Sequence, residues 1–232
     1  MSDDPAAKFD SGRAAEYDRQ SRIALAGYEA CHELTACLLA ASLGVDSART
    51  LLVVGAGTGQ EMVAIGRHAP RWRFVAVDPS PAMIVVAQTR LDALGLRDRA
   101  TLHCSHLHEL PAERYDGATL IGVLHHLKGR EPRAALLHEI AARLGPGAPF
   151  VLAGNFRRYA SEPLLVQAWQ ERWRQHGATS DEVAAKFATI TQGVEPPESE
   201  QKVLDHLDDA GFTGGHLFFA SLFWGAWIAH KR

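Results

Sequence analysis

The stretch LLVVGAGTGQE, residues 51–61, restricts the fold more than any other part of the chain. Four apolar residues run directly into three glycines at alternate positions, Gly55, Gly57 and Gly59, and helix-compatible residues follow. This order predicts a buried strand, a tight loop and a helix in succession. Ordering flexible glycines costs conformational entropy, and a ligand lying against the bare main chain would offset that cost. We therefore predict a ligand-binding loop at the end of this strand.

Strands and helices are predicted to alternate after this loop. Apolar runs predict strands at residues 50–54, 74–77, 100–103, 118–122 and 149–153, with helices between them. This spacing is typical of an α/β fold in which a doubly wound, mostly parallel sheet carries helices on both faces. Two apolar and aromatic runs at 216–220 and 225–230 then predict a final antiparallel pair of strands.

Helices are predicted at both ends of this alternating region. Residues 11–43 have apolar side chains at helical spacing, with a break near Gly27 and a stop at Gly44. A second helical stretch, at about 156–198, is predicted as an insertion before the last helix and strands. We expect an N-terminal helical segment over residues 1–46 and a core over residues 47–232.

Composition excludes several classes of protein. The formal net charge is -3 over 232 residues, so no global positive field attracts nucleic acid or an anionic membrane. No apolar run reaches membrane-spanning length, and residues 1–10 are too polar and acidic for a secretory signal. Three cysteines at no metal-like spacing predict a reduced, cytoplasmic protein without a metal site.

Asp78 strengthens the prediction of a ligand loop. It ends the second predicted strand, nineteen residues after Gly59, where a carboxylate can accept hydrogen bonds from both ribose hydroxyls; a helix-capping role is compatible with this one. The dinucleotide fingerprint would require glycine at position 60, which is Gln60. This disfavours an NAD-dependent dehydrogenase and favours S-adenosylmethionine, a nucleoside without a pyrophosphate.

Four motifs, in order, resemble those of class I S-adenosylmethionine-dependent methyltransferases: VVGAGTGQ, VAVDPSPAM, YDGATLIGVLHHL and LGPGAPFVLAG. The resemblance covers about residues 48–155 and implies a Rossmann-like, seven-stranded sheet ending in an antiparallel hairpin. It also implies a set of cofactor contacts: Gly55, Gly57 and Gly59 at the methionine and ribose portion, Asp78 at the ribose hydroxyls, Met83 near adenine, His106 at the adenine edge, and Gly122 below the reactive methyl.

A narrower resemblance covers nearly the whole chain. YDRQSRIALAGY, DPSPAM and the tail from EPLL through LDDAGFTGGHLFF to GAWIAHK are similar to the carboxy-S-adenosylmethionine synthase subgroup and its methyltransferase relatives. This resemblance implies that residues 1–46 form a lid whose Tyr28 contacts the methionine end of the cofactor. A simple helix-packing role for Tyr28 is the alternative.

Three positions depart from these families. The arginine with which the synthase holds the extra carboxylate of its cofactor aligns with Phe187, which forms no ion pair. Methyl transfer is therefore favoured over carboxymethyl chemistry serving tRNA wobble uridine modification. Val53 stands where class I enzymes often have an acid, and His106 where an acid meets adenine. These two residues keep a non-catalytic nucleoside-binding protein as a further alternative.

The candidate catalytic residues are His125 and His126. They follow the fourth predicted strand, at the edge of the sheet where α/β folds bind ligands, and histidine titrates near neutral pH. Either could accept a proton if the methyl acceptor must lose one, although packing or capping is the alternative for one of them. We expect a small-molecule acceptor reacting at nitrogen or oxygen, and the aromatic-rich tail makes a homodimer plausible.

Overall fold

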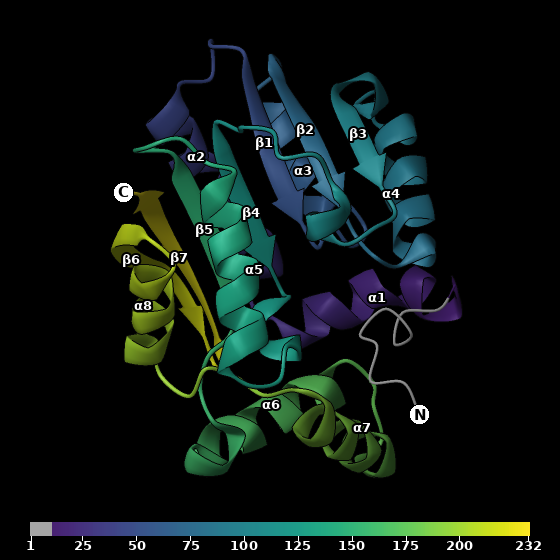
Figure 1. Ribbon diagram of the computed structural model, residues 1–232. Helices are drawn as coiled ribbons and strands as arrows, with labels where there is room; N and C mark the ends of the chain where they lie inside the picture. The colour runs from purple at the N-terminus through teal and green to yellow at the C-terminus, as the bar shows by residue number, and fades with distance from the viewer. Residues whose placement is uncertain (1–10) are drawn as a thin grey trace.

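The computed structural model describes residues 11–232, with side chains from Glu16 onward (Figure 1). The predicted absence of a secretory signal in residues 1–10, and the first part of the predicted lid, lie outside the described residues. The sheet and the helices that form the candidate site all lie within them.

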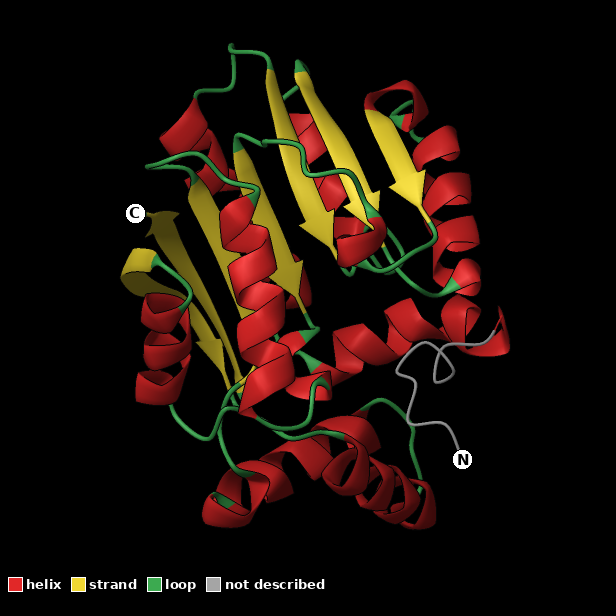
Figure 2. Cartoon of the chain, viewed as in Figure 1, coloured by secondary structure: helices red, strands yellow, loops and turns green. Residues whose placement is uncertain are grey.

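Seven strands form a single sheet in the order β3-β2-β1-β4-β5-β7-β6 (Figure 2). Strands β1 to β5 pair in parallel, β7 runs antiparallel to β5, and β6 antiparallel to β7. The strands are β1 (Arg49–Val54), β2 (Trp72–Val77), β3 (Ala100–His103), β4 (Gly117–Ile121), β5 (Pro149–Asn155), β6 (Phe212–Ser221) and β7 (Trp224–Lys231). This topology confirms the predicted mostly parallel, seven-stranded sheet with a C-terminal antiparallel hairpin.

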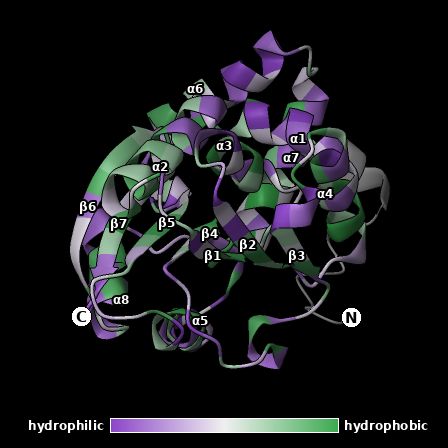
Figure 3. Cartoon of the chain, turned by 90° about the horizontal axis from the view of Figure 1, so that it is seen from above, coloured by the Kyte–Doolittle hydropathy of each residue, from purple (hydrophilic) through white to green (hydrophobic). Residues whose placement is uncertain are grey.

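The helices cover both faces of the sheet, as expected for a doubly wound fold. Helices α5 and α8 pack on one face, and α2, α3 and α4 on the other (Figure 3). The helices are α1 (Ser11–Ala24), α2 (Tyr28–Leu43), α3 (Gln60–His68), α4 (Pro81–Ala93), α5 (Arg130–Ala142), α6 (Pro163–Gln175), α7 (Ser180–Gly193) and α8 (Glu200–Asp209). The predicted helix break at Gly27 and the stop at Gly44 are both present, because each glycine has a positive φ that ends regular helix.

Strand β1 is the centre of the core. Leu51 and Val53 pack against α2 and α3, whereas Leu52 and Val54 face α5, since side chains alternate along a strand. All four are buried, which explains the uninterrupted apolar run: a parallel strand covered on both faces needs apolar residues at every position.

Three helices lie beyond the carboxyl ends of the parallel strands, where α1 crosses below β1 to β3 and above α6 and α7 (Figure 1). A cluster that includes Ile23 and Phe187 joins α1 to these helices and contains the aromatic pair Trp169 and Trp173. The Trp169 indole N–H donates to the Ala24 carbonyl at 2.7 Å. The two tryptophans therefore belong to a satellite core that supports α1.

Strand β6 begins at Phe212, earlier than the predicted residue 216. Gly214 and Gly215 interrupt the apolar pattern of the sequence directly before the predicted start. In the structure they lie at an irregularity of the strand, between Thr213 and His216. A Cβ on Gly215 would lie 2.7 Å from a Leu204 methyl, so helix α8 packs directly against bare backbone.

We predict that the hairpin contributes substantially to stability through Phe212. Its ring is fully buried and stacks on Phe150 of β5 with 4.7 Å between centroids. Phe212→Ala should lower the free energy of unfolding by about 3–5 kcal/mol, measured by urea denaturation. The control Leu164→Ala, at a residue 73% exposed, should change it by about 0.5 kcal/mol or less. Equal effects of the two substitutions would contradict the prediction.

Candidate functional site

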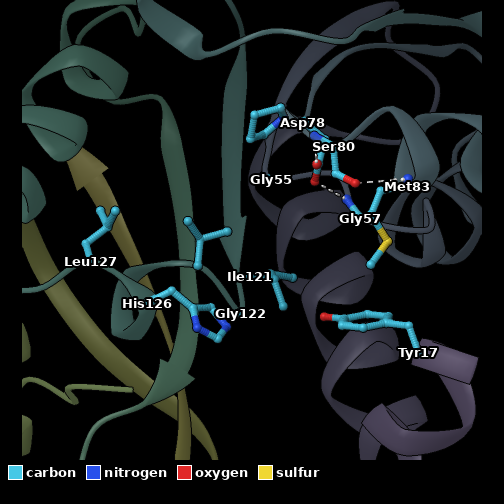
Figure 4. Close-up of a pocket in the computed structure, with 12 residues that line it drawn as sticks. Tyr17, Gly55, Gly57, Asp78, Ser80, Met83, Ile121, Gly122, His126 and Leu127 are labelled. Carbon is cyan, nitrogen blue, oxygen red and sulfur yellow. Dashed lines mark hydrogen bonds between the residues drawn. The ribbon is translucent and has the colours of Figure 1, made fainter. Parts of the chain in front are cut away.

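A cleft of about 600 Å³ opens at the carboxyl edge of the sheet, between the ends of β1, β2 and β4 and helix α1 (Figure 4). Its position, at the carboxyl ends of parallel strands, is where open α/β sheets bind ligands. The lining residues are Tyr17, Gly55, Gly57, Asp78, Pro79, Ser80, Met83, Ile121, Gly122, Val123, His126 and Leu127.

The three glycines of the loop have different structural roles. All three have positive φ, which glycine adopts without steric cost. A Cβ on Gly55 would lie 2.2 Å from a Val123 methyl, whereas one on Gly57 would meet no atom closer than 4.0 Å. Gly57 therefore leaves the cleft open. Gly59 is outside the lining; it is the N-cap residue of α3, and a Cβ there would press on Ala87 at 3.3 Å.

Asp78 connects this loop to the end of β2. One carboxylate oxygen accepts the Gly57 N–H and the other the Ser80 N–H, both at 2.9 Å. Burial raises the pKa of Asp78, and the two N–H donors oppose that rise. Ser80, whose hydroxyl accepts the Met83 N–H, is the helix cap of α4. Asp78 instead lines the cleft.

The two adjacent histidines have separate environments. His125 is buried, its Nδ1 accepts the Asn155 N–H at 3.3 Å, and its ring meets Trp224 edge-on. A Cβ on Gly154 would lie 2.7 Å from that nitrogen, so the imidazole occupies the space beside bare β5 backbone. Burial lowers the pKa of His125 well below its ordinary value, which keeps the ring neutral. His126, in contrast, lines the cleft.

Arg133 of α5 holds the segment that carries His126. Its side chain is buried, donates to the Leu127 carbonyl at 2.9 Å and pairs with Glu195 at 3.1 Å. The Glu195 N–H donates in turn to the His125 carbonyl at 2.9 Å. Glu195, in the loop before α8, therefore holds the residues on either side of His126: His125 directly and Leu127 through Arg133. The sequence pattern gave no indication of these contacts.

Besides Gly59, two residues predicted to contact the cofactor, Tyr28 and His106, lie outside the cleft lining. Tyr28 is buried in α2 with its ring 4.6 Å from that of His32, and Tyr17 of α1 lines the cleft. His106 is exposed and stacks on His108 at 5.5 Å. Its electrostatic interaction with Asp78 acts to lower the pKa of that carboxylate, against the larger effect of burial.

Glu61 is a buried acid that the sequence analysis missed. It is 4% exposed, and its carboxylate accepts the Thr119 hydroxyl at 2.5 Å. Thr119 pairs in register with Val53, the residue that stands where class I enzymes often have an acid. The Glu61 carboxylate therefore lies next to this strand position. Burial raises the pKa of Glu61 to about 8, and Asp78 adds to the rise. An acid two residues after the last loop glycine was the signal in the sequence.

Residues 11–232 contain no group of three or more His, Cys, Asp or Glu side chains arranged to hold a metal ion. His106 and His108, which follow β3, are therefore not part of such a group. None of the helices in this range is both long and apolar enough to cross a membrane.

Protein families and curated sequences both include proteins similar to this chain. Residues 52–150 match the family described as a methyltransferase domain. A carboxy-S-adenosyl-L-methionine synthase from Haemophilus ducreyi is 26% identical over 97% of this chain and 92% of its own length. The family match includes the glycine loop, Asp78 and both histidines.

Solved structures share the fold at low identity. The magnesium protoporphyrin IX methyltransferase of Synechocystis, solved with bound S-adenosylhomocysteine, is 16% identical with a TM-score of 0.62 over 94% of each chain. An O-methyltransferase family protein from Burkholderia thailandensis is 19% identical with a TM-score of 0.63. That match covers this whole chain but only 65% of the Burkholderia protein, less than two thirds of its length.

We predict a pH-dependent stability that originates at Glu61. The pKa of this residue rises from its ordinary value of 4.5 to about 8 in the folded protein. Between these values the folded state retains a proton that the unfolded chain loses, so stability falls as pH rises. The slope is at most about 1.4 kcal/mol per pH unit. Glu61→Gln should remove this part of the decline.

Urea denaturation at several pH values between 5 and 8 tests this prediction. The difference in unfolding free energy between wild type and Glu61→Gln should shift steadily in favour of the variant as pH increases. Glu171→Gln, a change at an exposed helical residue, is the matched control and should follow wild type throughout. A constant difference between wild type and Glu61→Gln would show that Glu61 does not titrate in this range.

Proposed function

Because the chain contains a class I S-adenosylmethionine-dependent methyltransferase domain, we propose that it transfers a methyl group to nitrogen or oxygen of a small-molecule acceptor. The observation that carries this proposal is the cleft that joins the bare main chain of Gly55 and Gly57 to the carboxylate of Asp78. A protein that binds a nucleoside in this cleft without catalysing a reaction is the non-catalytic alternative.

The residues of the cleft fit the expected cofactor. When bound, S-adenosylmethionine supplies an activated methyl group attached to a positively charged sulfur. Asp78 would accept hydrogen bonds from the ribose hydroxyls, and the open space at Gly57 would admit the ligand to the backbone. Met83 would pack near adenine, with His106 at the adenine edge. Gly59 would shape the loop, Gly122 would leave room below the methyl group, and Tyr28 would support the lid.

His126 is the proposed proton acceptor. It lies in the cleft at the end of β4, and the buried His125 and Arg133 anchor the segment around it. Its imidazole would take the proton that an N–H or O–H acceptor must lose. Apolar neighbours, among them Ile121, Val123 and Leu127, would exclude water from the reacting groups. His125, predicted as an equal candidate, is proposed to have a positioning role.

The charges around the cleft support methyl rather than carboxymethyl transfer. None of the described lining residues is an arginine or a lysine, and a second carboxylate on the cofactor would need such a partner. Phe187 is buried in the satellite core. The neighbouring Lys186 ammonium lies 4.1 Å from the Trp173 ring centre and donates to Gln20 at 2.8 Å. The synthase-like activity remains the alternative, because the Haemophilus relative has that name.

Location and assembly are part of the proposal. We propose a cytoplasmic enzyme, in which residues 1–46 form the lid and residues 47–232 the core with the α6–α7 insertion. A homodimer through the aromatic-rich tail is a further proposal, which sedimentation equilibrium would test.

Calorimetric titration with S-adenosylmethionine tests the proposed site. Asp78→Asn removes the charge that would accept the ribose hydroxyls, and should weaken binding by about tenfold to a hundredfold. Asp116→Asn is the matched control: Asp116 also accepts a backbone N–H, from Thr50, but at the opposite end of β1. Wild-type protein that does not bind, or equal affinities for wild type and Asp78→Asn, would overturn the proposal.

Mass spectrometry of ligand retained by the purified protein separates the two activities. Carboxy-S-adenosylmethionine is heavier than S-adenosylmethionine by the mass of one carbon dioxide. We expect the lighter compound, and recovery of the heavier one would replace methyl transfer with the synthase-like alternative.

The role of His126 has a kinetic test. In a screen of amines and phenols that follows S-adenosylhomocysteine release, His126→Gln should lower the rate by about a hundredfold, with cofactor affinity unchanged. His108→Gln, at an exposed histidine outside the lining, should retain the wild-type rate. An unchanged rate in His126→Gln would exclude His126 as the base, and binding without turnover of any acceptor would favour the non-catalytic alternative.

A further inference from the structure

Tyr17 brings helix α1 into the cleft. Figure 4 shows its ring on the side of the cleft opposite Asp78, with the hydroxyl directed toward Ile121 and Gly122 at the end of β4. Tyr17 is a lining residue supplied from outside the sheet, so its position depends on how α1 is held.

The residue after Tyr17 forms a polar contact with two other elements. Asp18 accepts the Thr58 hydroxyl at 2.5 Å through one carboxylate oxygen and pairs with the Arg90 guanidinium through the other. Arg90 also donates to the Thr58 hydroxyl oxygen at 3.0 Å. We name Asp18, Thr58 and Arg90 the latch. It joins α1 to the glycine loop and to α4.

The latch is shielded from water, which distinguishes it from ordinary surface ion pairs. The side chains of Asp18 and Arg90 are 17% and 21% exposed, and Thr58 is 3% exposed. Burial lowers the pKa of Arg90. Removing one member of such a pair leaves the other charge poorly solvated and unpaired, which is costly. Arg22, 3.8 Å from Asp18, belongs to α1 itself and does not connect the helix to the loop.

A separate set of contacts holds the other end of α1. Arg172 of α6 donates to the carbonyls of Ile23 and Arg22 at 2.7 and 2.8 Å. These bonds fix the last turn of the helix, near the satellite core. The latch lies one to two turns earlier in the helix, directly after Tyr17.

We propose that Asp18, Thr58 and Arg90 position Tyr17 over the ligand cleft by locking α1 onto the glycine loop and α4. The identity of the ligand rests on the proposed function. Thr58 lies between Gly57, which leaves the cleft open, and Gly59, the N-cap residue of α3. A ligand held by the loop therefore stabilises the docked helix, and the docked helix increases the affinity for the ligand by the same factor.

A double-mutant cycle in the full-length protein tests the coupling. Asp18→Asn and Arg90→Gln should each weaken S-adenosylmethionine binding about tenfold, equivalent to roughly 1.4 kcal/mol, and the double variant should be no weaker than either single one. Thr58→Val, which changes no charge, should weaken binding to a smaller extent. Glu16→Gln removes an exposed ion pair with Arg19 on the same helix and should bind like wild type. Unchanged affinity in all latch variants, or additive losses, would overturn the proposal.

Limited trypsin digestion gives a readout that does not depend on the ligand. Without ligand, Asp18→Asn and Arg90→Gln should be cut after Arg19 and Arg22 several times faster than wild type and Glu16→Gln, and S-adenosylmethionine should protect wild type most. Equal rates in all variants would refute the latch even if the cofactor binds. If wild type binds no S-adenosylmethionine, the proposed function fails, and the ligand-free digestion still decides whether the latch holds α1.

Discussion

The hydrogen bond from the Gly57 N–H to the Asp78 carboxylate, at 2.9 Å, is the constraint on which the candidate site depends. It requires β1 and β2 to end at the same edge, which their parallel pairing provides. Backbone N–H groups of Gly55 and Ala56 also donate to the Val77 carbonyl, so the loop turns back across the end of β2. Side chains are absent where this turn meets the cleft, and the main chain is left accessible.

Buried polar groups support this edge from several directions. Glu61 and Thr119 join α3 to β4 beneath the cleft, and Arg133 ties the segment after β4 to the loop before α8. Such groups are stable only when their hydrogen bonds are satisfied, and each therefore restrains the two elements that it connects. The cleft is therefore bordered by the carboxyl edge of the sheet and, from outside the sheet, by Tyr17 of α1.

The position of Glu61 gives a physical account of one departure from the class I pattern. Val53 cannot supply the acid common at the end of the first strand, and Glu61 reaches the register partner of Val53 from the helix. The departure at Phe187 concerns the choice of activity. Phe187 and its neighbour Lys186 both make their contacts away from the cleft, in the satellite core and on Trp173, which leaves the cleft without a described cation for a second carboxylate.

The sequence alone determined the order of the elements, the parallel sheet and the location of the glycine loop and Asp78. These features follow from strand periodicity, from glycine conformation and from an acid at the end of a strand, each of which depends on residues close together in the chain. Only the tertiary structure decided the separate environments of His125 and His126, the presence of Tyr17 in the cleft lining and the pairing of Asp18 with Arg90. The last two residues are 72 positions apart, and adjacent histidines differ only in what packs against them. Burial, and pairing between residues so far apart in the sequence, depend on how helices pack on the sheet. A local sequence pattern carries no information about that packing.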